Sequence, residues 1–168
     1  MLEVRYLDPS RDADVFREAW EWMESAPRWF RDCYNAWKET FEEQMDAAKG
    51  ELNYGIFEGG EPSAIIRLAE ARPWIFQTHL SARQRTPLDT LITGGRMVRN
   101  YLFDHGVKGF YGFVPAKNRS VICLFSSLGF MDTGVRCFKG TTHGKVIEWR
   151  QFALGKNQVA NPETFNLE

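Results

Sequence analysis

The sequence predicts an α/β protein in which helices pack on a mixed β-sheet, and two observations carry this prediction. Short runs with the period of a strand are interspersed with longer runs that have apolar residues at helical spacing. One such helix lies between two strands, an arrangement that typically makes a right-handed parallel crossover. With 168 residues, 43% of them hydrophobic and 26% charged, the chain can bury the core of one domain. We therefore expect a single domain over residues 1–154 and a polar tail over residues 155–168.

The first fifty residues predict one strand and two helices. Apolar residues alternate with charged ones from Leu2 to Tyr6, as in a strand with one buried face. Apolar residues then recur at helical spacing from Asp14 to Ser25 and again from about Trp29 to Lys49. Gly50 is the expected end of the second helix.

The middle of the chain predicts three strands. Residues 52–58 and 62–72 are β-favouring runs joined by Gly59-Gly60, which is typical of an antiparallel hairpin. Pro73 interrupts the chain, and a further strand is expected from Trp74 to Leu80. Strand alternation places Trp74, Phe76, Thr78 and Leu80 on one face, and Ile75, Gln77 and His79 on the other.

A helix start follows the third of these strands. Thr86 has the position of an N-cap, Pro87 that of the first helical residue, and Asp89 can reach back to the cap. The helix is expected to end at Gly106. Gly94-Gly95 in its middle weakens the helical pattern.

Residues 109–130 predict a strand, a sharp break and a capped helix. The strand surrounds Gly112, and Pro115 ends it because proline has no N–H to donate. Asn118 or Ser120 can cap the helix, and Gly129 can end it. The apolar face of this helix is expected to comprise Val121, Cys123, Leu124 and Phe125.

Two closing strands, residues 133–139 and 145–154, complete a β-α-α-β-β-β-α-β-α-β-β order across a turn at residues 140–144. This order corresponds to a mixed sheet with helices on its faces.

Composition argues against several classes of protein. The net charge is -1 and no run of Lys or Arg stands out, which argues against a nucleic-acid partner. No stretch approaches the roughly 18 apolar residues of a membrane span, so no membrane association is expected. Cys33, Cys123 and Cys137 form no CxxC pair, which favours a reducing compartment over a disulfide framework or a metal site. We expect a cytoplasmic protein without a metal.

The spacing of five residues in the 109–130 stretch resembles a motif of the GNAT superfamily of acyl-coenzyme A dependent N-acetyltransferases. These residues are Asn118, Val121, Phe125, Gly129 and Phe130. The resemblance implies a GNAT-like fold over residues 2 to about 154 and a divergent member of the superfamily. It also implies acetyl-coenzyme A or coenzyme A as cofactor, and chains of a bacteriophage-encoded branch are similar.

The resemblance implies a cofactor site at the helix start near residue 86. The superfamily has an Arg or Gln leading into a glycine-rich turn, whose N–H groups bind the pyrophosphate. Here Arg85 stands at the Arg and Thr86 where a glycine is expected, with Arg83 nearby. An alternative is that residues 93–96 form the true turn in a shifted register. Asn118 and Phe125, from the second motif, complete the expected cofactor-binding set.

Catalytic candidates follow from the same resemblance. An amine acceptor needs a base on or near the strand that ends at Leu80, and His79 and Glu70 are the candidates. The superfamily commonly has a proton-donating Tyr where this chain has Phe125, so Tyr111 is a candidate substitute, with Cys123 and Ser126 as alternatives.

The first two helices carry a concentration of aromatic residues that suits an acceptor pocket, a protein contact surface or simply the core. The core is the simplest explanation for Trp20, Trp29 and Trp37, which share the buried stripe; Trp22, Phe30 and Tyr34 complete the set.

Three functions remain open from the sequence. The first is an N-acetyltransferase that moves an acetyl group to a small-molecule or protein amine. The second is a catalytically inactive GNAT-like protein that acts in assembly, as a homo-oligomer or with another partner. The third is a small-ligand sensor without chemistry.

Overall fold

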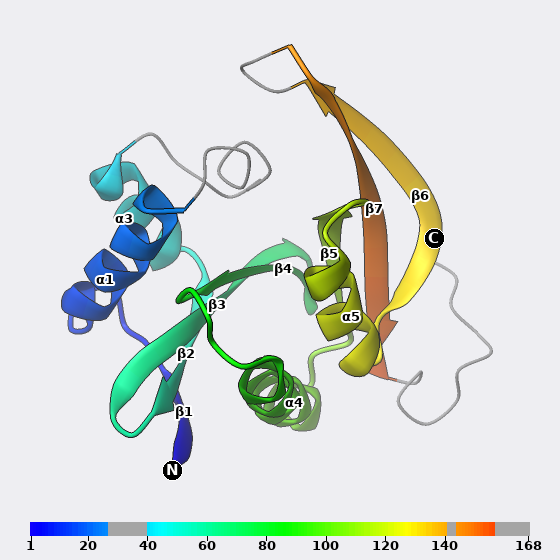
Figure 1. Ribbon diagram of the computed structural model, residues 1–168. Coiled ribbons are helices and arrows are strands. Elements are labelled where there is room, and N and C mark those ends of the chain that lie inside the picture. The colour runs from blue at the N-terminus through cyan, green and yellow to red at the C-terminus, as the bar shows by residue number, and fades with distance from the viewer. Residues whose placement is uncertain (27–39, 141–143, 157–168) are drawn as a thin grey trace. The chain divides into compact units, whose positions relative to one another are not determined.

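The computed structural model describes residues 1–26, 40–140 and 144–156 (Figure 1). The chain forms two compact units, which are described separately. Unit 1 comprises Met1–Ala69 and Thr78–Val98, and unit 2 comprises Glu70–Gln77 and Arg99–Glu168. Within the described ranges no helix is long and apolar enough to cross a membrane. The expectation of a single domain over residues 1–154 stays a prediction.

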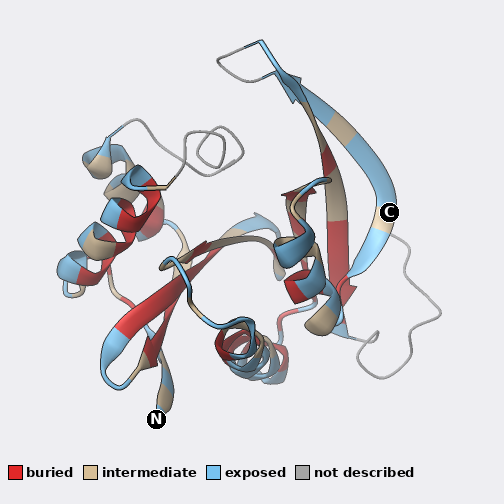
Figure 2. Ribbon diagram, in the orientation of Figure 1, coloured by how far each residue is buried: buried red, intermediate tan, exposed pale blue. Residues whose placement is uncertain are grey.

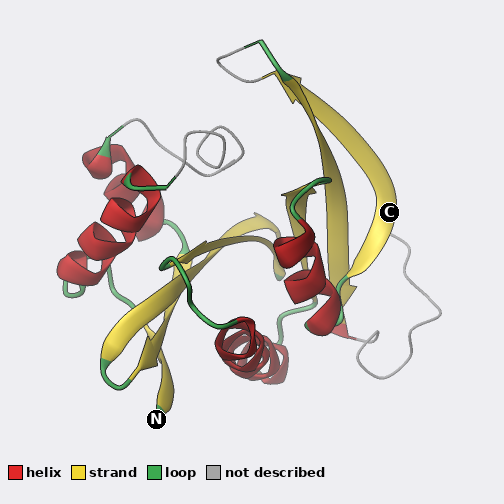
Figure 3. Cartoon of the chain, viewed as in Figure 1, coloured by secondary structure: helices red, strands yellow, loops and turns green. Residues whose placement is uncertain are grey.

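The predicted mixed α/β architecture is confirmed (Figure 3). The seven strands form one sheet in the order β1-β2-β3-β4-β5-β7-β6. Neighbours β1 and β2, β2 and β3, β5 and β7, and β6 and β7 pair antiparallel, whereas β4 and β5 pair parallel, as expected for strands joined through a helix. The elements are β1 Leu2–Tyr6, α1 Ala13–Glu24, α3 Phe41–Lys49, β2 Leu52–Glu58, β3 Glu61–Arg72, β4 Ile75–Ala82, α4 Leu88–Asp104, β5 Gly109–Pro115, α5 Arg119–Ser127, β6 Met131–Gly140 and β7 Val146–Gly155.

The long helix predicted from Trp29 to Lys49 is wrong as one continuous element. Thr40 has extended backbone, with φ -125° and ψ 156°, and α3 begins at the next residue. The Thr40 hydroxyl accepts the Glu43 N–H at 3.2 Å, and the Glu43 carboxylate accepts the Thr40 N–H at 3.4 Å. This capping box starts a helix at Phe41, and Thr40 and Glu43 carry its sequence pattern. The predicted residues 29–39 lie outside the described residues.

Unit 1 buries α1 and α3 in a common apolar cluster with strand residues. Its buried members are Leu7, Val15, Phe16, Ala19, Trp22, Ala48, Phe57 and Ile65. Buried residues also run along β2 and β3, red in Figure 2, because both faces of these central strands are covered. Each apolar side chain that is fully removed from water there contributes roughly 1.5–3 kcal/mol to folding.

Helix α4 approaches β2 unusually closely at Gly94. A Cβ at this position would lie 2.5 Å from Cδ1 and 3.0 Å from Cγ2 of Ile56, a side chain with 0% exposure. The Cγ2 methyl is fixed to the Ile56 Cβ, so a rotation of the distal side chain cannot relieve both contacts. The glycine that weakens the helical pattern therefore lets the helix contact the sheet.

Replacing Gly94 tests this close contact. Gly94→Ala should lower the free energy of unfolding by about 1–3 kcal/mol, because the new methyl overpacks against Ile56. In a helix position without such a neighbour, the same change would raise it by about 1 kcal/mol. Chemical denaturation of the wild type and the variant measures the difference.

Two further variants make the interpretation specific. Ile56→Ala lowers stability in the wild-type background, but it should remove most of the penalty of Gly94→Ala because the clash disappears. Thr93→Ala, at the exposed neighbouring helix position, should be neutral or slightly stabilising. A stabilised Gly94→Ala protein would contradict the close approach.

Unit 2 contains β5 between the first residues of β4 and the long strand β7. Ile75 to Gln77 are in register with Gly109 to Tyr111. All seven residues of β5 pair with β7, from Gly109 with Gly155 to Pro115 with Trp149. On α5 the buried side chains are Leu124 and Phe125, whereas Cys123 is exposed. The prediction of Cys123 on the apolar face is wrong, because the helical turn places it away from its two buried neighbours.

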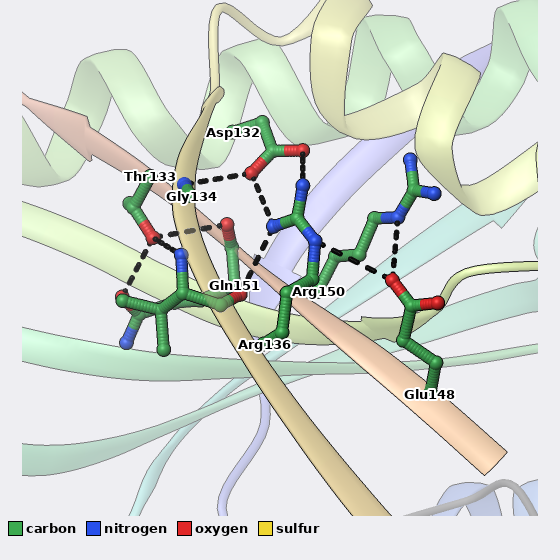
Figure 4. Close-up of polar contacts among 8 residues, drawn as sticks. Asp132, Thr133, Gly134, Arg136, Glu148, Arg150 and Gln151 are labelled. Carbon is green, nitrogen blue, oxygen red and sulfur yellow. Dashed lines mark hydrogen bonds and ion pairs between the residues drawn. The ribbon is translucent and has the colours of Figure 1, made fainter.

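The β6–β7 hairpin carries a network of charges on its surface (Figure 4). Arg136 donates from Nη1 and Nη2 to the two carboxylate oxygens of Asp132, at 2.8 and 2.9 Å. Glu148 Oε1 lies 3.4 Å from the Nε atoms of Arg136 and Arg150. The register of the two strands shifts between Asp132 and Arg136, so the bidentate pair spans a bulge in the edge strand.

The bidentate pair is expected to contribute to the free energy of unfolding at neutral pH. The hydrogen bonds from Arg136 lower the pKa of Asp132, burial acts in the opposite direction, and the Gly134 N–H assists the lowering. The contribution is therefore present above the ordinary carboxyl pKa of 3.8 and is lost as the pH falls through the lowered folded-state pKa. Asp132→Asn should cost about 0.2–1 kcal/mol at pH 7.

Denaturation from pH 7 to pH 2 measures this dependence, and the difference between wild type and Asp132→Asn should shrink towards acid. Arg136→Gln should remove the same pH-dependent part, and the double variant should lose it only once. A difference that stays constant down to pH 2 would contradict the assignment.

Candidate functional site

The loop between β4 and α4 turns sharply at Arg85, in unit 1. The Arg83 carbonyl accepts the Thr86 N–H at 3.1 Å, which closes a four-residue turn. Its third residue, Arg85, has φ 67°, the left-handed conformation that type II turns normally assign to glycine. A side-chain-bearing residue in this conformation costs roughly 1–2 kcal/mol. The turn thus replaces the expected glycine by a strained, exposed arginine, and Arg83 is half-buried beside it.

Thr86 holds this loop but does not cap the helix in the predicted way. Its hydroxyl lies within donating distance of two carbonyl oxygens, 2.8 Å from Arg83 and 3.1 Å from Ser63. Helix α4 begins at Leu88, and Pro87 lies immediately before it instead of at its first position. The hydroxyl proton is directed to backbone carbonyls because they are the acceptors within reach of this turn.

The N-terminus of α4 is the second anion-attracting feature of unit 1. The first N–H groups of a helix have no partner within the helix, and the helix dipole adds positive potential there. In this 17-residue helix the first two residues, Leu88 and Asp89, are exposed. Arg83, Arg85 and the helix end favour an anionic ligand, whereas the carboxylate of Asp89 opposes one.

The alternative turn at residues 93–96 is wrong, because these residues lie inside α4. Gly94 serves the contact with Ile56 described above, so its lack of a side chain is explained by packing.

Glu70 lies near the end of β3, in unit 2. Its Oε1 accepts the N–H of Trp74 at 2.9 Å. Trp74 has φ 66° and is 50% exposed, so it lies in the turn before β4 and not in the strand as predicted. The carboxylate of Glu70 therefore supports a strained turn, and its role as a base stays a prediction.

The other two catalytic candidates lie on neighbouring strands of the sheet. His79 is half-buried on the part of β4 that belongs to unit 1. Tyr111 is half-buried on β5 in unit 2, and its hydroxyl donates to Oε1 of Gln77 at 3.4 Å. The ring of Tyr111 meets that of Phe113 edge-on, with centroids 6.2 Å apart. These contacts orient the phenol, and the catalytic roles of both residues stay predictions.

The second motif forms a cap and a core contact in unit 2. Asn118 is the N-cap of α5, and its side-chain oxygen accepts the Val121 N–H at 3.3 Å. Phe125 is 8% exposed, and its ring centroid lies 4.6 Å from that of Phe130 and 6.0 Å from that of Phe152. The predicted cap at Asn118 is confirmed. The predicted contacts of Asn118 and Phe125 with a cofactor stay predictions.

The aromatic residues of α1 belong to the core. Trp20 and Trp22 are 8% and 9% exposed, which confirms the core explanation for Trp20. The other members of the aromatic set, at positions 29, 30, 34 and 37, lie outside the described residues. A cavity of about 20 Å³ beside α1 has room for roughly one water molecule. Its lining residues are Phe16, Ala19, Trp20, Met23, Gln44, Ile65, Arg67 and Ser81.

The structure also reveals buried polar contacts that no local sequence pattern indicates. Arg67 and Glu51 form an ion pair of 2.7 Å with side chains only 4% and 12% exposed. Ser63 and Thr90 are buried, and both donate their hydroxyl groups to Glu58. The Glu58–Thr90 contact joins residues 32 positions apart, so no local pattern could have indicated it.

The predicted site residues divide between the two units. Unit 1 holds His79, Arg83, Arg85 and Thr86, and unit 2 holds Glu70, Tyr111, Asn118 and Phe125. Within the predicted set, Arg83 and Thr86 are joined by hydrogen bonds. Cys123 and Cys137 carry free thiols, and in the described residues no cluster of His, Cys, Asp and Glu could hold a metal ion.

No family model matches this chain, and no curated protein matches it significantly. Solved structures do match. An acetyltransferase of the GNAT family from Streptococcus pneumoniae is 13% identical with a TM-score of 0.72, over 92% of this chain and 99% of that one. A mutant spermidine N-acetyltransferase from Vibrio cholerae is 13% identical with a TM-score of 0.75, over 97% of this chain and 98% of that one.

A dodecameric structure of spermidine N-acetyltransferase from Vibrio cholerae is also similar. It is 13% identical with a TM-score of 0.69, over 97% of this chain and 98% of that one. At such identities the likeness establishes the fold and nothing finer.

Proposed function

We propose that this chain, which has the GNAT fold that its sequence predicts, is an N-acetyltransferase that moves an acetyl group from acetyl-coenzyme A to an amine. The observation that carries the proposal is the two-arginine turn at the start of α4. It occupies the place in the element order where the superfamily binds the pyrophosphate, and it offers two cations and a helix N-terminus.

The residues at this turn fit coenzyme A through charge instead of through glycines. Arg83 and Arg85 would contact the phosphate oxygens, and the N–H groups at the start of α4 would complete the anion site. Acetyl-coenzyme A supplies the activated acyl group when it is bound. The strain at Arg85 is consistent with a functional role, because strained residues that persist are frequently found at ligand sites.

The proton transfers of the reaction would fall to side chains on β4 and β5. Histidine side chains in general change their charge near neutral pH, which suits a base that takes a proton from an ammonium group, so His79 is the proposed base. Glu70 is the alternative base. The Tyr111 hydroxyl holds a proton that its bond to Gln77 orients, so Tyr111 is the proposed acid in place of the missing tyrosine at Phe125.

Calorimetry with coenzyme A tests the proposal directly. We expect the wild type to bind coenzyme A with a submillimolar dissociation constant. Arg85→Gln should weaken binding about fivefold to tenfold because it removes one charged phosphate contact. Arg85→Lys keeps the charge and should lose less. Absence of binding to the wild type at millimolar coenzyme A would overturn the proposal.

Asp89 gives a prediction with the opposite sign. Asp89→Asn should strengthen coenzyme A binding about fivefold, because it removes a negative charge from the anion site. The repulsion between this charge and a phosphate is worth roughly 1 kcal/mol. Asp104→Asn, at the other end of the same helix, is the matched control and should leave the affinity unchanged. Equal affinities of wild type and Asp89→Asn would place the phosphates away from this helix end.

The acceptor is proposed to be a small-molecule or protein amine. Spermidine is the first compound to test, because similar solved structures are named as spermidine N-acetyltransferases. Release of free thiol from acetyl-coenzyme A in the presence of spermidine and other primary amines measures turnover. An oligomeric state belongs to the same proposal, since one of the similar structures is dodecameric.

A second candidate function is an inactive GNAT-fold protein that acts in assembly. It is favoured by Phe125, which places a buried ring where a proton donor is expected, and by the edge strand β6. Phe138 on this strand is 67% exposed and Val146 on its partner is 69% exposed, as a protein contact surface would require. A strictly monomeric protein that acetylates a simple amine would rule this candidate out, and sedimentation analysis measures the oligomeric state.

A further inference from the structure

The turn and first helical residues of the proposed anion site are fastened to the β2–β3 hairpin by two residues. These are Glu58, the last residue of β2, and Ser63, near the start of β3. Glu58 Oε1 accepts the Thr90 hydroxyl at 2.7 Å, and Glu58 Oε2 accepts the Ser63 hydroxyl at 3.2 Å. One carboxylate thus joins the hairpin to the first turn of α4.

Ser63 also holds the loop before the helix. Its carbonyl oxygen accepts the Arg83 N–H at 2.9 Å and lies 3.1 Å from the Thr86 hydroxyl. Ser63 is 0% exposed, so water does not compete for these contacts. A single buried residue of β3 therefore holds the chain on both sides of Arg85, through the backbone of Arg83 and the side chain of Thr86.

The hydrogen bond between Thr90 and Glu58 has a defined donor and acceptor. Thr90 is 9% exposed, and an ionised Glu58 can only accept, so the hydroxyl proton must point from Thr90 to Glu58. A hydrogen bond to a charged acceptor is stronger than one between neutral groups. It sets the rotation of the first helical turn, whereas the Gly94 contact with Ile56 sets the approach of the next turns.

The three anchored groups, the Arg83 N–H and the hydroxyls of Thr86 and Thr90, all lie within residues 83–90, the segment that carries both arginines and the helix N-terminus. In a glycine-rich cradle the backbone itself fits around the phosphates. Here the turn has no glycine, and its shape depends on contacts from another element.

We infer that Glu58, Ser63 and Thr90 are positioning residues for the pyrophosphate site, and that they hold the Arg83–Thr90 segment in its binding shape without touching the ligand. This inference rests on the proposed function. It makes a prediction that a simple charge effect reverses: removal of the negative Glu58 near an anion site should strengthen binding by electrostatics, but it should weaken binding if Glu58 acts by positioning.

Thr90 provides the uncharged test. Thr90→Val removes the hydroxyl and keeps the shape, and it should weaken coenzyme A binding about tenfold by calorimetry. Thr90→Ser keeps the hydroxyl and should restore affinity to within about threefold of the wild type. Glu58→Ala should also bind more weakly. Hydrogen exchange at the amides of residues 83–91 should speed up in Thr90→Val and Glu58→Ala without ligand.

Glu51→Gln is the matched control, because it perturbs another partly buried carboxylate of unit 1, at the opposite end of β2. It should lower the thermal midpoint without changing coenzyme A affinity, measured where every variant is folded. A wild type that binds coenzyme A, together with Thr90→Val and Glu58→Ala variants that bind it equally or more tightly, overturns the positioning role alone. A wild type that does not bind overturns the proposed function and this inference with it, before any variant is compared.

Discussion

The close contact between α4 and β2 at Gly94 is the constraint on which the architecture of unit 1 depends. A Cβ at this position would lie 2.5 Å from Cδ1 of Ile56, so glycine lets the helix come this close to the sheet without a shift of either element. The contact brings the start of α4 within reach of Glu58 and Ser63, whose bonds to Thr90 and the preceding loop then become possible. A packing requirement in the middle of the helix therefore determines the geometry of its end.

The proposed anion site contains charges that attract a phosphate and one that repels it, all within residues 83–89. Arg83 and Arg85 supply charge that glycines cannot, while the carboxylate of Asp89 opposes a phosphate and itself interacts favourably with the helix N-terminus. The left-handed backbone of Arg85 is stored strain, and the buried contacts of Ser63 hold it in place. Such a site would bind by side-chain charge and a rigid backbone, two properties that separate substitutions can alter independently.

In unit 2, three residues that the sequence marks as functional candidates have structural roles. Asn118 caps α5, Phe125 packs between Phe130 and Phe152, and Glu70 supports the turn at Trp74. Each has a sufficient structural explanation, so a catalytic function is better sought in the oriented hydroxyl of Tyr111 and, in unit 1, in His79. The exposed edge of β6 and its charged network are separate features that suit contact with another protein.

The sequence by itself determined the order of the elements, the cap at Asn118 and the mixed sheet, because alternation, capping and glycine stops are local properties of the chain. It also contains the capping box of Thr40 and Glu43, which a longer apolar stripe obscures. Only the tertiary structure decided that Gly94 packs against Ile56, that Thr86 bonds Ser63, and that Glu58 holds Thr90. These contacts join residues 23 to 38 positions apart, and side-chain distances between separate elements exist only once the sheet and its helices have assembled.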